Sequence, residues 1–591
     1  MEDFEAFLLE KKVVRPAQLE QASNSGFETT EPLYYRLLRK FPDLEEPLWR
    51  ALAEFLGLEL VDPHQIQLKP ELIQIVPARL AHKYAIVPID QTGTRLDIAL
   101  ADPNQFEKCE EFSLLFSQQA TDKNPAQTPL KVTPHLAMPG DVAMLIKSLY
   151  GIGADTVQDM LDHHTEGKSD MPVLAMIGPE VVDLTNIEGT NEDAAIIRFV
   201  NQLLLEAVKI GASDIHLEPF EKELSVRYRV DGMLQREPVP ERIKNLEPAI
   251  ISRIKIMARM DIAEKRLPQD GQIRLMVMGR TIDVRVSILP TMFGQGLALR
   301  LLDRQITFRR LDNLGIPSDY LRLFREVLKL SHGVILVTGP TGSGKTTTLY
   351  SCLNEICTED RKIITVEDPI EYQLEGISQI QVKPDIGLNF ANVLRNILRH
   401  DPDIIMVGEI RDTATAQLAI SAAMTGHLVF STLHTNNAPS APVRLLEMGV
   451  EPYLVSSTLE AVVAQRLVRR LCRHCRQDVT SRDALPEEYR DQVEEQTIYE
   501  SRGCPLCRQT GYQGRTAIFE MFTLNDHIRN LILKRADSSK INEEAMRLGM
   551  RSLRQSGLDK VISGETSLVE IYRVTREETI DMRGVLQEDY R

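Results

Sequence analysis

The fold is decided by the stretch VILVTGPTGSGKT, residues 334–346. Its first five residues suit a buried strand, residues 339–346 fit the pattern G-x-x-x-x-G-K-[ST], and the following TTLY suits the start of a helix. Strand, glycine-rich loop and helix in this order are typical of a phosphate site, because backbone N–H groups at a helix N-terminus bind anions. Strands and helices continue to alternate from Leu311 to the end, which predicts an α/β fold with a parallel sheet.

The loop itself carries the predicted nucleotide contacts. Lys345 would place its charge on the β- and γ-phosphates, and the hydroxyl of Thr346 would bind Mg²⁺. A chance glycine-rich turn is the alternative, but the flanking strand and helix argue against it. We predict that a nucleotide is bound by Gly339, Pro340, Thr341, Gly342, Ser343, Gly344, Lys345, Thr346 and Thr347.

Two further strand-like runs end in acidic residues. DIIMVGE ends at Glu409, and residues 362–366 are followed by Glu367, Asp368 and Glu371. Acids at the carboxyl ends of parallel strands lie where ligands bind. We expect Glu409 near Mg²⁺ and the γ-phosphate, and one acid of residues 367–371 to position or deprotonate the attacking water. For Glu409, a capping acid on a buried strand is the alternative.

Two histidines flank a third strand-like run. His427 precedes it and His434 follows it. A single histidine is more often structural, but a pair beside a phosphate loop could respond to the γ-phosphate.

Four of the seven cysteines form two C-x-x-C pairs. Thiolates in this arrangement suit a closed, tetrahedral, structural zinc site, with free thiols as the alternative. The predicted ligands are Cys472, Cys475, Cys504 and Cys507.

Composition excludes several classes of protein. The chain has 85 acidic residues against 69 Lys and Arg, a net charge of −16, which argues against a sequence-independent grip on nucleic acid. No apolar run approaches the roughly 18 residues of a membrane span. The N-terminal MEDFEAFLLEKK lacks the apolar core of a secretory signal, so we expect a cytoplasmic protein.

Changes in pattern along the chain predict three domains and a linker. Residues 1–150 mix helical and strand-like text, residues 151–190 form an acidic flexible linker, and residues 191–310 form a small α+β domain. Residues 311–591 form the P-loop domain, with the cysteine subdomain at 465–520.

Four motifs in this order resemble the secretion-ATPase superfamily: VTGPTGSGKTTTLY, ITVEDPIEY, ILRHDPDIIMVGEIRD and TGHLVFSTLHTN. They are similar to the hexameric ATPases of type II secretion and type IV pilus assembly. The resemblance implies a multidomain α/β chain. Its RecA-like P-loop ATPase domain with a zinc subdomain would follow a small α+β (PAS-like) domain and an N-terminal α+β docking domain. It also implies ATP, Mg²⁺ and Zn²⁺ as cofactors.

Carried over residue by residue, the resemblance assigns roles outside the loop. Glu367 resembles the catalytic glutamate of the Asp box, Glu409 that of Walker B, and His434 with His427 the His box. Arg285 and Arg300 of the small domain would reach the phosphates when the two domains close. The chain departs from the family pattern at Gln295, Asn437 and the helix from Asp412. Further arginines are expected to support nucleotide contacts or subunit interfaces: Arg395, Arg399, Arg411, Arg444 and Arg515.

The predicted function is that of an ATP-hydrolysing motor of type II secretion, working as a homo-hexamer. Its expected partners are an inner-membrane platform protein and the cytoplasmic domain of a membrane-anchored component, which would hold it peripherally at the inner membrane. A type IV pilus assembly ATPase is the main alternative. A nucleic-acid motor, a non-enzymatic nucleotide-sensing scaffold and a retraction motor are weaker ones. The N-terminal residues hold no clean copy of the Arg-Leu-Gly-type motif that binds cyclic di-GMP in some relatives.

Overall fold

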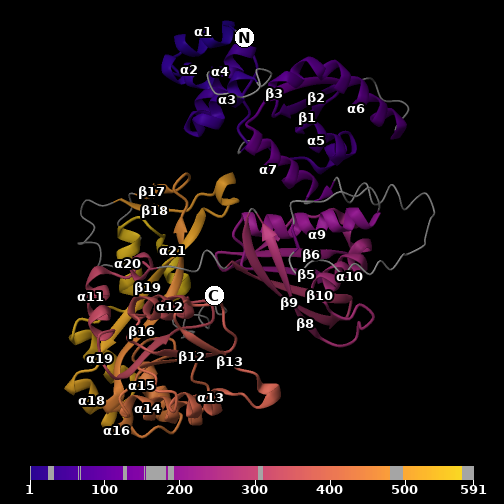
Figure 1. Cartoon of the computed structure of the whole chain (residues 1–591). Helices are drawn as coiled ribbons and strands as arrows, with labels where there is room; N and C mark the ends of the chain where they lie inside the picture. Colours follow the sequence, from indigo (N-terminus) through magenta and orange to yellow (C-terminus); the bar gives the residue numbers. More distant parts are fainter. Residues whose placement is uncertain are drawn as a thin grey trace, which may run out of the picture. The chain divides into compact units, whose positions relative to one another are not determined.

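The structure, a computed structural model, divides into two compact units, Met1–Leu301 and Leu302–Arg591 (Figure 1). It describes residues 2–23, 32–63, 66, 68–123, 130–151, 153–154, 182–183, 192–277, 279–303, 310–479 and 497–575. The predicted acidic linker lies almost wholly outside these residues, and so does the middle of the predicted cysteine subdomain. Among the described helices, none has the length and apolar character needed to cross a membrane.

The first unit opens with a helical module whose core surrounds the only tryptophan of the chain. Trp49 is 1% exposed and packs with Leu8, Leu37 and Leu52, and its ring centroid lies 6.0 Å from that of Tyr34. These apolar residues recur at helical spacing, which is why the segments fold as amphipathic helices. The helices are α1 (Glu2–Glu10), α2 (Pro16–Ser23), α3 (Leu33–Lys40) and α4 (Glu45–Leu56).

A three-stranded sheet follows this module. Strands β1 (Ile86–Thr92) and β2 (Arg95–Leu100) form an antiparallel hairpin, and β3 (Lys131–Leu136) pairs parallel with β2. A parallel neighbour requires a crossover connection, and α6 (Cys109–Lys123) lies in the connection between β2 and β3. The accompanying helices are α5 (Ala78–Tyr84), α6 (Cys109–Lys123) and α7 (Pro139–Tyr150).

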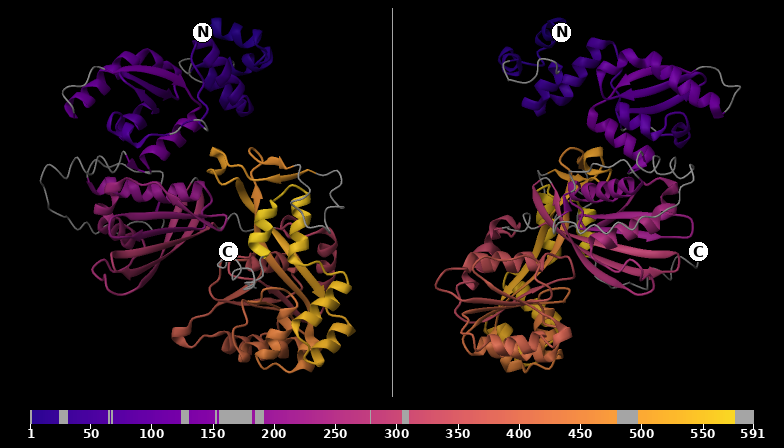
Figure 2. Two further views of the ribbon diagram at one scale, coloured as in Figure 1. Left: turned by 180° about the vertical axis from the view of Figure 1, so that it is seen from behind. Right: turned by 45° about the vertical axis from the view of Figure 1, so that its right-hand side comes forward.

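A seven-stranded sheet completes the first unit, in the order β4-β8-β9-β10-β5-β6-β7. Alternate residues of β9, such as Val284, Val286 and Ile288, are buried in one core with residues of the helices α9 and α10. These two helices therefore cover one face of the sheet (Figure 2). The elements are β4 (Val182–Asp183), α9 (Glu192–Lys209), β5 (Asp214–Pro219), β6 (Leu224–Val230), β7 (Met233–Glu237), α10 (Glu247–Met257), β8 (Gln269–Val277), β9 (Arg280–Thr291) and β10 (Gly294–Asp303).

The second unit is built on another seven-stranded sheet, in the order β13-β12-β14-β15-β11-β16-β19. All neighbours pair in parallel except the last pair, β16 and β19. This arrangement confirms the predicted α/β fold. The strands are β11 (Gly333–Thr338), β12 (Ile363–Glu367), β13 (Ser378–Gln381), β14 (Ile404–Val407), β15 (Leu428–Leu433), β16 (Leu459–Leu471) and β19 (Tyr512–Thr523), with β17 (Gln477–Val479) and β18 (Ile498–Glu500) in a separate pair.

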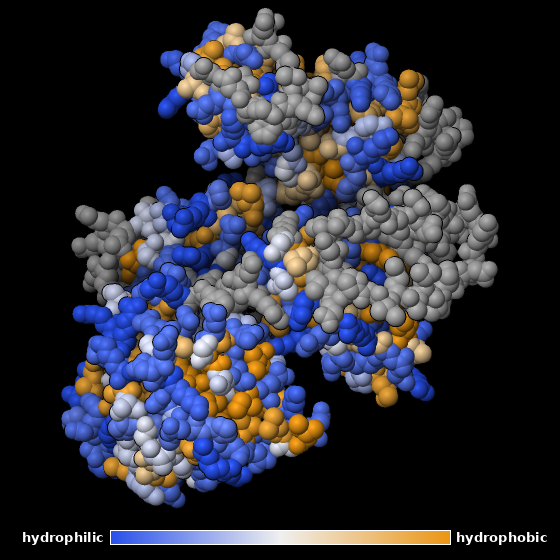
Figure 3. Space-filling model, viewed as in Figure 1, coloured by the Kyte–Doolittle hydropathy of each residue, from blue (hydrophilic) through white to orange (hydrophobic). Residues whose placement is uncertain are grey.

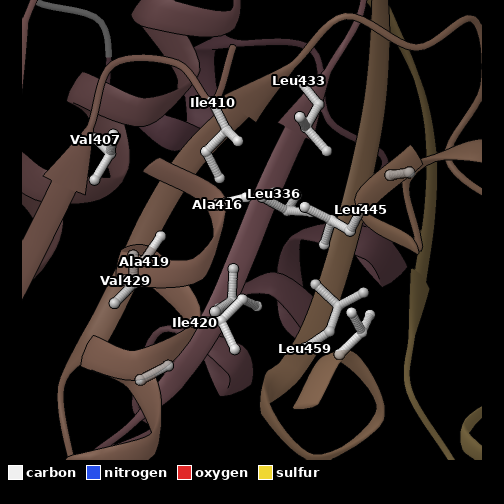
Figure 4. Packing of buried hydrophobic residues seen from close by; sticks show 14 of the residues in the cluster. Leu336, Val407, Ile410, Ala416, Ala419, Ile420, Val429, Leu433, Leu445 and Leu459 are labelled. Atoms are coloured by element: carbon white, nitrogen blue, oxygen red, sulfur yellow. The ribbon is translucent and has the colours of Figure 1, made fainter. Parts of the chain in front are cut away.

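Helices cover both faces of this sheet because its central strands are apolar on both sides. In β11, Leu336 faces one core and Ile335 the other. Figure 4 shows Leu336 packed among Ala416, Ile420 and Leu445 in the first core. The helices are α11 (Ser318–Val327), α12 (Lys345–Ile356), α13 (Phe390–Ile397), α14 (Thr413–Met424), α15 (Ser440–Glu447), α16 (Pro452–Thr458), α18 (Asp526–Leu533), α19 (Ser538–Arg547), α20 (Leu553–Ile562) and α21 (Leu568–Thr575).

The visible surface of the described residues mixes hydrophilic and apolar side chains (Figure 3). Single apolar residues are exposed on the second unit, among them Ile386, Met424 and Tyr453. Scattered exposure of this kind is ordinary for a globular protein.

Candidate active site

The phosphate loop joins β11 to α12 as the sequence predicts. Every residue of β11 is buried, whereas Pro340, Thr341 and Gly342 are exposed at the tip of the loop. Lys345 begins α12, and its Nζ donates to the carbonyl oxygens of Gly339 (2.7 Å) and Pro340 (3.1 Å). The side chain of Lys345 therefore folds back over the phosphate loop.

Two buried hydroxyl groups at this loop lack a partner among the described residues. They are Oγ1 of Thr338, at the end of β11, and Oγ of Ser343. A buried polar atom without a hydrogen bond is costly, and a bound ion or water is one explanation for it. The donor set of the loop thus fits a bound phosphate group.

Glu409 lies two residues beyond β14, beside the loop. Its carboxylate contacts the guanidinium of Arg411 and lies 3.4 Å from Nε2 of His434, which follows β15. Burial lowers the pKa of Lys345, and the negative charge of Glu409 acts against this shift. The parallel strands β11, β14 and β15 therefore bring Lys345, Glu409 and His434 to one end of the sheet.

Glu367, the last residue of β12, is held differently. It is 4% exposed, and Thr365 Oγ1 (2.5 Å), Gln379 Nε2 (3.1 Å) and the hydroxyl of Tyr350 all donate to its carboxylate. Burial raises the pKa of Tyr350, so this phenol remains a donor. The carboxylate of Glu367 thus has protein partners on both oxygens.

The predicted arginines of the small domain lie in the first unit. Arg300 on β10 donates through Nε to Asp214 (2.9 Å), and Arg285 on β9 pairs in register with Gln272. Their approach to a nucleotide stays a prediction. In the second unit, Arg395, Arg399 and Arg444 contact Asn392, Asn396 and Glu447 of their own helices or helix ends, and Arg515 pairs in register with Arg469.

Two departures from the family pattern have structural partners. Gln295 donates to the carbonyl oxygen of Lys265 (3.3 Å). Asn437 accepts from the backbone N–H of Ser440 (3.0 Å), at the start of α15.

The four paired cysteines converge, as the sequence predicts. Their sulfur atoms lie within 4.8 Å of one another, and the pairs Cys472–Cys504 and Cys475–Cys507 are each 3.8 Å apart. A zinc ion with four sulfur ligands at about 2.3 Å gives a tetrahedron with edges of about 3.8 Å. Backbone N–H groups of Cys504 (3.1 Å) and Gly511 (3.2 Å) donate to the sulfur of Cys507, as befits a thiolate. These residues fit a zinc ion, whereas His474 is exposed.

Comparison with known proteins decides the family. The model of the type II/IV secretion system protein family matches residues 189–573, and that of the MshEN domain matches residues 56–156. The chain belongs to the type II/IV secretion system protein family. The resemblance seen in the sequence is thereby confirmed, as is ATPase activity.

The similarity to two of three members of this family extends over nearly the whole chain. Type II secretion system protein E of Xanthomonas campestris pv. campestris is 41% identical, over 96% of this chain and 98% of its own. The type IV pilus assembly ATPase PilB of Myxococcus xanthus is 38% identical, over 95% and 96%. Type II secretion system protein HxcR of Pseudomonas aeruginosa is 51% identical, over 70% and 83%.

Sequence reasoning missed four residues around the site. Tyr350 and Gln379 hold Glu367, and Gln465 and Arg466 of β16 contact the phosphate loop and the His-box segment. The only signal was the polar pair Gln465-Arg466 inside an otherwise apolar strand, AVVAQRLV, where a buried amide needs partners.

Proposed function

We propose that this family member is the ATPase of a type II secretion system. The main support for this proposal is the 41% identity to a type II secretion system protein E over almost the full length of both chains. A type IV pilus assembly ATPase is the second candidate, because the similarity to PilB spans nearly the same residues. Deleting the gene should abolish export of secreted enzymes and leave piliation intact; the reverse result would favour the pilus role.

In the proposed site, residues 339–347 bind the phosphates of ATP. Lys345 leaves the carbonyl groups of Gly339 and Pro340 and pairs with the β- and γ-phosphates, while the loop amides and the Ser343 hydroxyl donate to phosphate oxygens. Thr346, exposed at the start of α12, would hold Mg²⁺. When bound, this ion neutralises charge on the transferring phosphoryl group.

We propose that Glu409 orients the attacking water. Arg411 and His434 fix its carboxylate in the absence of nucleotide, and His434 can move to the γ-phosphate when it arrives. Glu367 would act indirectly, by holding β12 against α12 through Tyr350 and against β13 through Gln379. This leaves the two more open acids of the same segment to share the work on water: Glu371, which is partly exposed, and Asp368, whose carboxylate lies 3.7 Å from Arg411.

Assembly and cofactors complete the proposal. In a ring of six chains, the small domain would close on the nucleotide through Arg285 and Arg300. A zinc ion on the four cysteines would stabilise the C-terminal end of β16. Residues 1–150 would dock on the cytoplasmic domain of a membrane-anchored component, placing the ring beneath an inner-membrane platform protein. The similarity to a type II secretion system protein E and the match to the MshEN domain support this arrangement. The net charge of −16 argues against nucleic acid as a partner.

The test of the site uses two substitutions and a control. Lys345→Ala should abolish ATP binding and turnover, and Glu409→Gln should keep binding but lower turnover by about 100-fold or more. Lys329→Ala, which removes an exposed lysine paired with Glu326, should change neither. If Lys345→Ala hydrolysed ATP at the parent rate, the assignment of the loop would be wrong.

A further inference from the structure

A buried glutamine lies directly behind the phosphate loop. Gln465 on β16 is 1% exposed, and its side chain reaches across to the loop. Its Nε2 donates to the carbonyl oxygen of Ser343 (2.7 Å), and its Oε1 accepts from Thr348 Oγ1 on α12 (2.7 Å). A carbonyl oxygen can only accept, so the orientation of the amide is fixed by Ser343.

Two glycines make this contact possible. A side chain at Gly344, with φ 91°, would lie 2.9 Å from Nε2 of Gln465. A side chain at Gly339, with φ 146°, would lie 2.7 Å from the backbone oxygen of Gln465. Both φ values lie in the region that favours glycine. The loop is therefore pressed against residue 465 at both of its ends.

The bond to Ser343 fixes the direction of one peptide group. In a trans peptide the C=O of one residue and the N–H of the next point in opposite directions. Because the Ser343 carbonyl points to Gln465, the Gly344 N–H points away from it. Among the residues that the structure describes, this N–H has no protein acceptor. It is one of the unpaired donors with which such loops bind phosphate.

We infer that Gln465 is a positioning residue for phosphate binding: it holds the Ser343–Gly344 peptide in the orientation that presents the Gly344 N–H to the nucleotide. This rests on the proposed nucleotide site. A glutamine is suited to the task because one amide can donate to the loop and accept from the helix at the same time. No charged side chain could replace both bonds.

Four variants of the full-length protein separate this role from simple support of the fold. Gln465→Met keeps the volume but removes both bonds, and Gln465→Glu keeps the acceptor for Thr348 but loses the donor to Ser343. Thr348→Val removes only the bond on the helix side. Thr458→Val is the matched control: Thr458 is 4% exposed and directly precedes β16, and its hydroxyl donates to the carbonyl oxygen of Leu454 (2.7 Å).

The readouts are the Kd of ADP with Mg²⁺, measured by calorimetry, and the melting temperature without nucleotide. We expect Gln465→Met and Gln465→Glu to weaken ADP binding by about 10-fold, the effect of one misplaced hydrogen bond to a charged group. Thr348→Val and Thr458→Val should lower the melting temperature but change Kd less than about twofold, within ordinary scatter of neutral changes.

Two outcomes would overturn the inference. One is a folded Gln465→Met protein whose Kd for ADP equals that of the parent. The other is a loss of affinity that simply follows the loss of stability across all four variants. Lys345→Ala, measured beside them, keeps the two proposals apart. If it still bound ADP, the site itself would be wrong; if it lost ADP while Gln465→Met did not, only the role of Gln465 would fail.

Discussion

At Glu367, donors from three elements converge on one carboxylate: Thr365 of β12, Tyr350 of α12 and Gln379 of β13. Glu409 has a looser setting, with one arginine and one histidine beside it and a side chain that is 16% exposed. Two acids that look equivalent in the sequence therefore have different surroundings, and substitutions should distinguish them.

Glu367→Gln should cost stability first. The new amide would turn an N–H toward groups that already donate, at about 1–3 kcal/mol for a buried mismatch. Turnover should fall with the melting temperature. Glu371→Gln should instead lower turnover and leave the melting temperature within about 1 °C, as surface changes usually do. Thermal melting and steady-state ATP hydrolysis measure both. A Glu367→Gln protein of parental stability and no turnover would show that Glu367 acts on water directly.

The guanidinium of Arg300 is exposed and pairs with Asp214. Such a surface ion pair is weak enough to be exchanged for a contact with a phosphate. Arg300→Ala and Arg285→Ala should lower kcat by about 100-fold or more with little change in ATP affinity, as for a contact made only in the transition state. Arg274→Ala, on the neighbouring β8 and paired with Asp283, is the control. A loss confined to KM would count against the clamp.

Among the elements, the two C-x-x-C pairs join the C-terminal end of β16 to the start of β19. Cys472 directly follows β16, and Cys507 lies shortly before β19. Purified protein should contain about one zinc per chain. Cys504→Ser should lose that zinc and unfold at a lower temperature, while ADP affinity stays near the parental value. Cys109→Ser, which changes a cysteine outside the cluster, should keep the metal. Metal-free protein with parental stability would exclude the zinc site.

How far the sequence predicts these elements depends on how local each signal is. The strand, loop and helix at 334–350 were predictable because all their constraints lie within 17 consecutive residues. The convergence of Cys472 and Cys507 was predictable because thiolate pairs imply a shared ion. Gln465 was not predictable: it lies 122 residues from Ser343, and strand order in a parallel sheet leaves no local periodicity. The same holds for Gln379 against Tyr350.

For the whole molecule, the division into two compact units lets us predict the effect of removing the N-terminal residues. A chain beginning at Glu192, the first residue of α9, keeps Arg285, Arg300 and the entire second unit. It should retain basal ATPase activity, yet lose membrane association and fail to support export. Fractionation of cells that carry the complete secretion machine measures this. Full-length Lys345→Ala, inactive but with the N-terminal residues, should still sediment with the membrane. If the truncated chain sediments as well, recruitment belongs to the ATPase ring.

The placement of Trp49 also gives the molecule a built-in optical probe. As the single indole of 591 residues, sealed in the helical module of residues 2–56, it should emit at short wavelength and resist quenching by acrylamide. Its fluorescence then reports on that module alone, whereas circular dichroism sums every domain. Under denaturant, separated fluorescence and dichroism midpoints would mean that the module melts independently of the motor. A change in emission when ATP is added would mean that a nucleotide-dependent change reaches the helical module around Trp49.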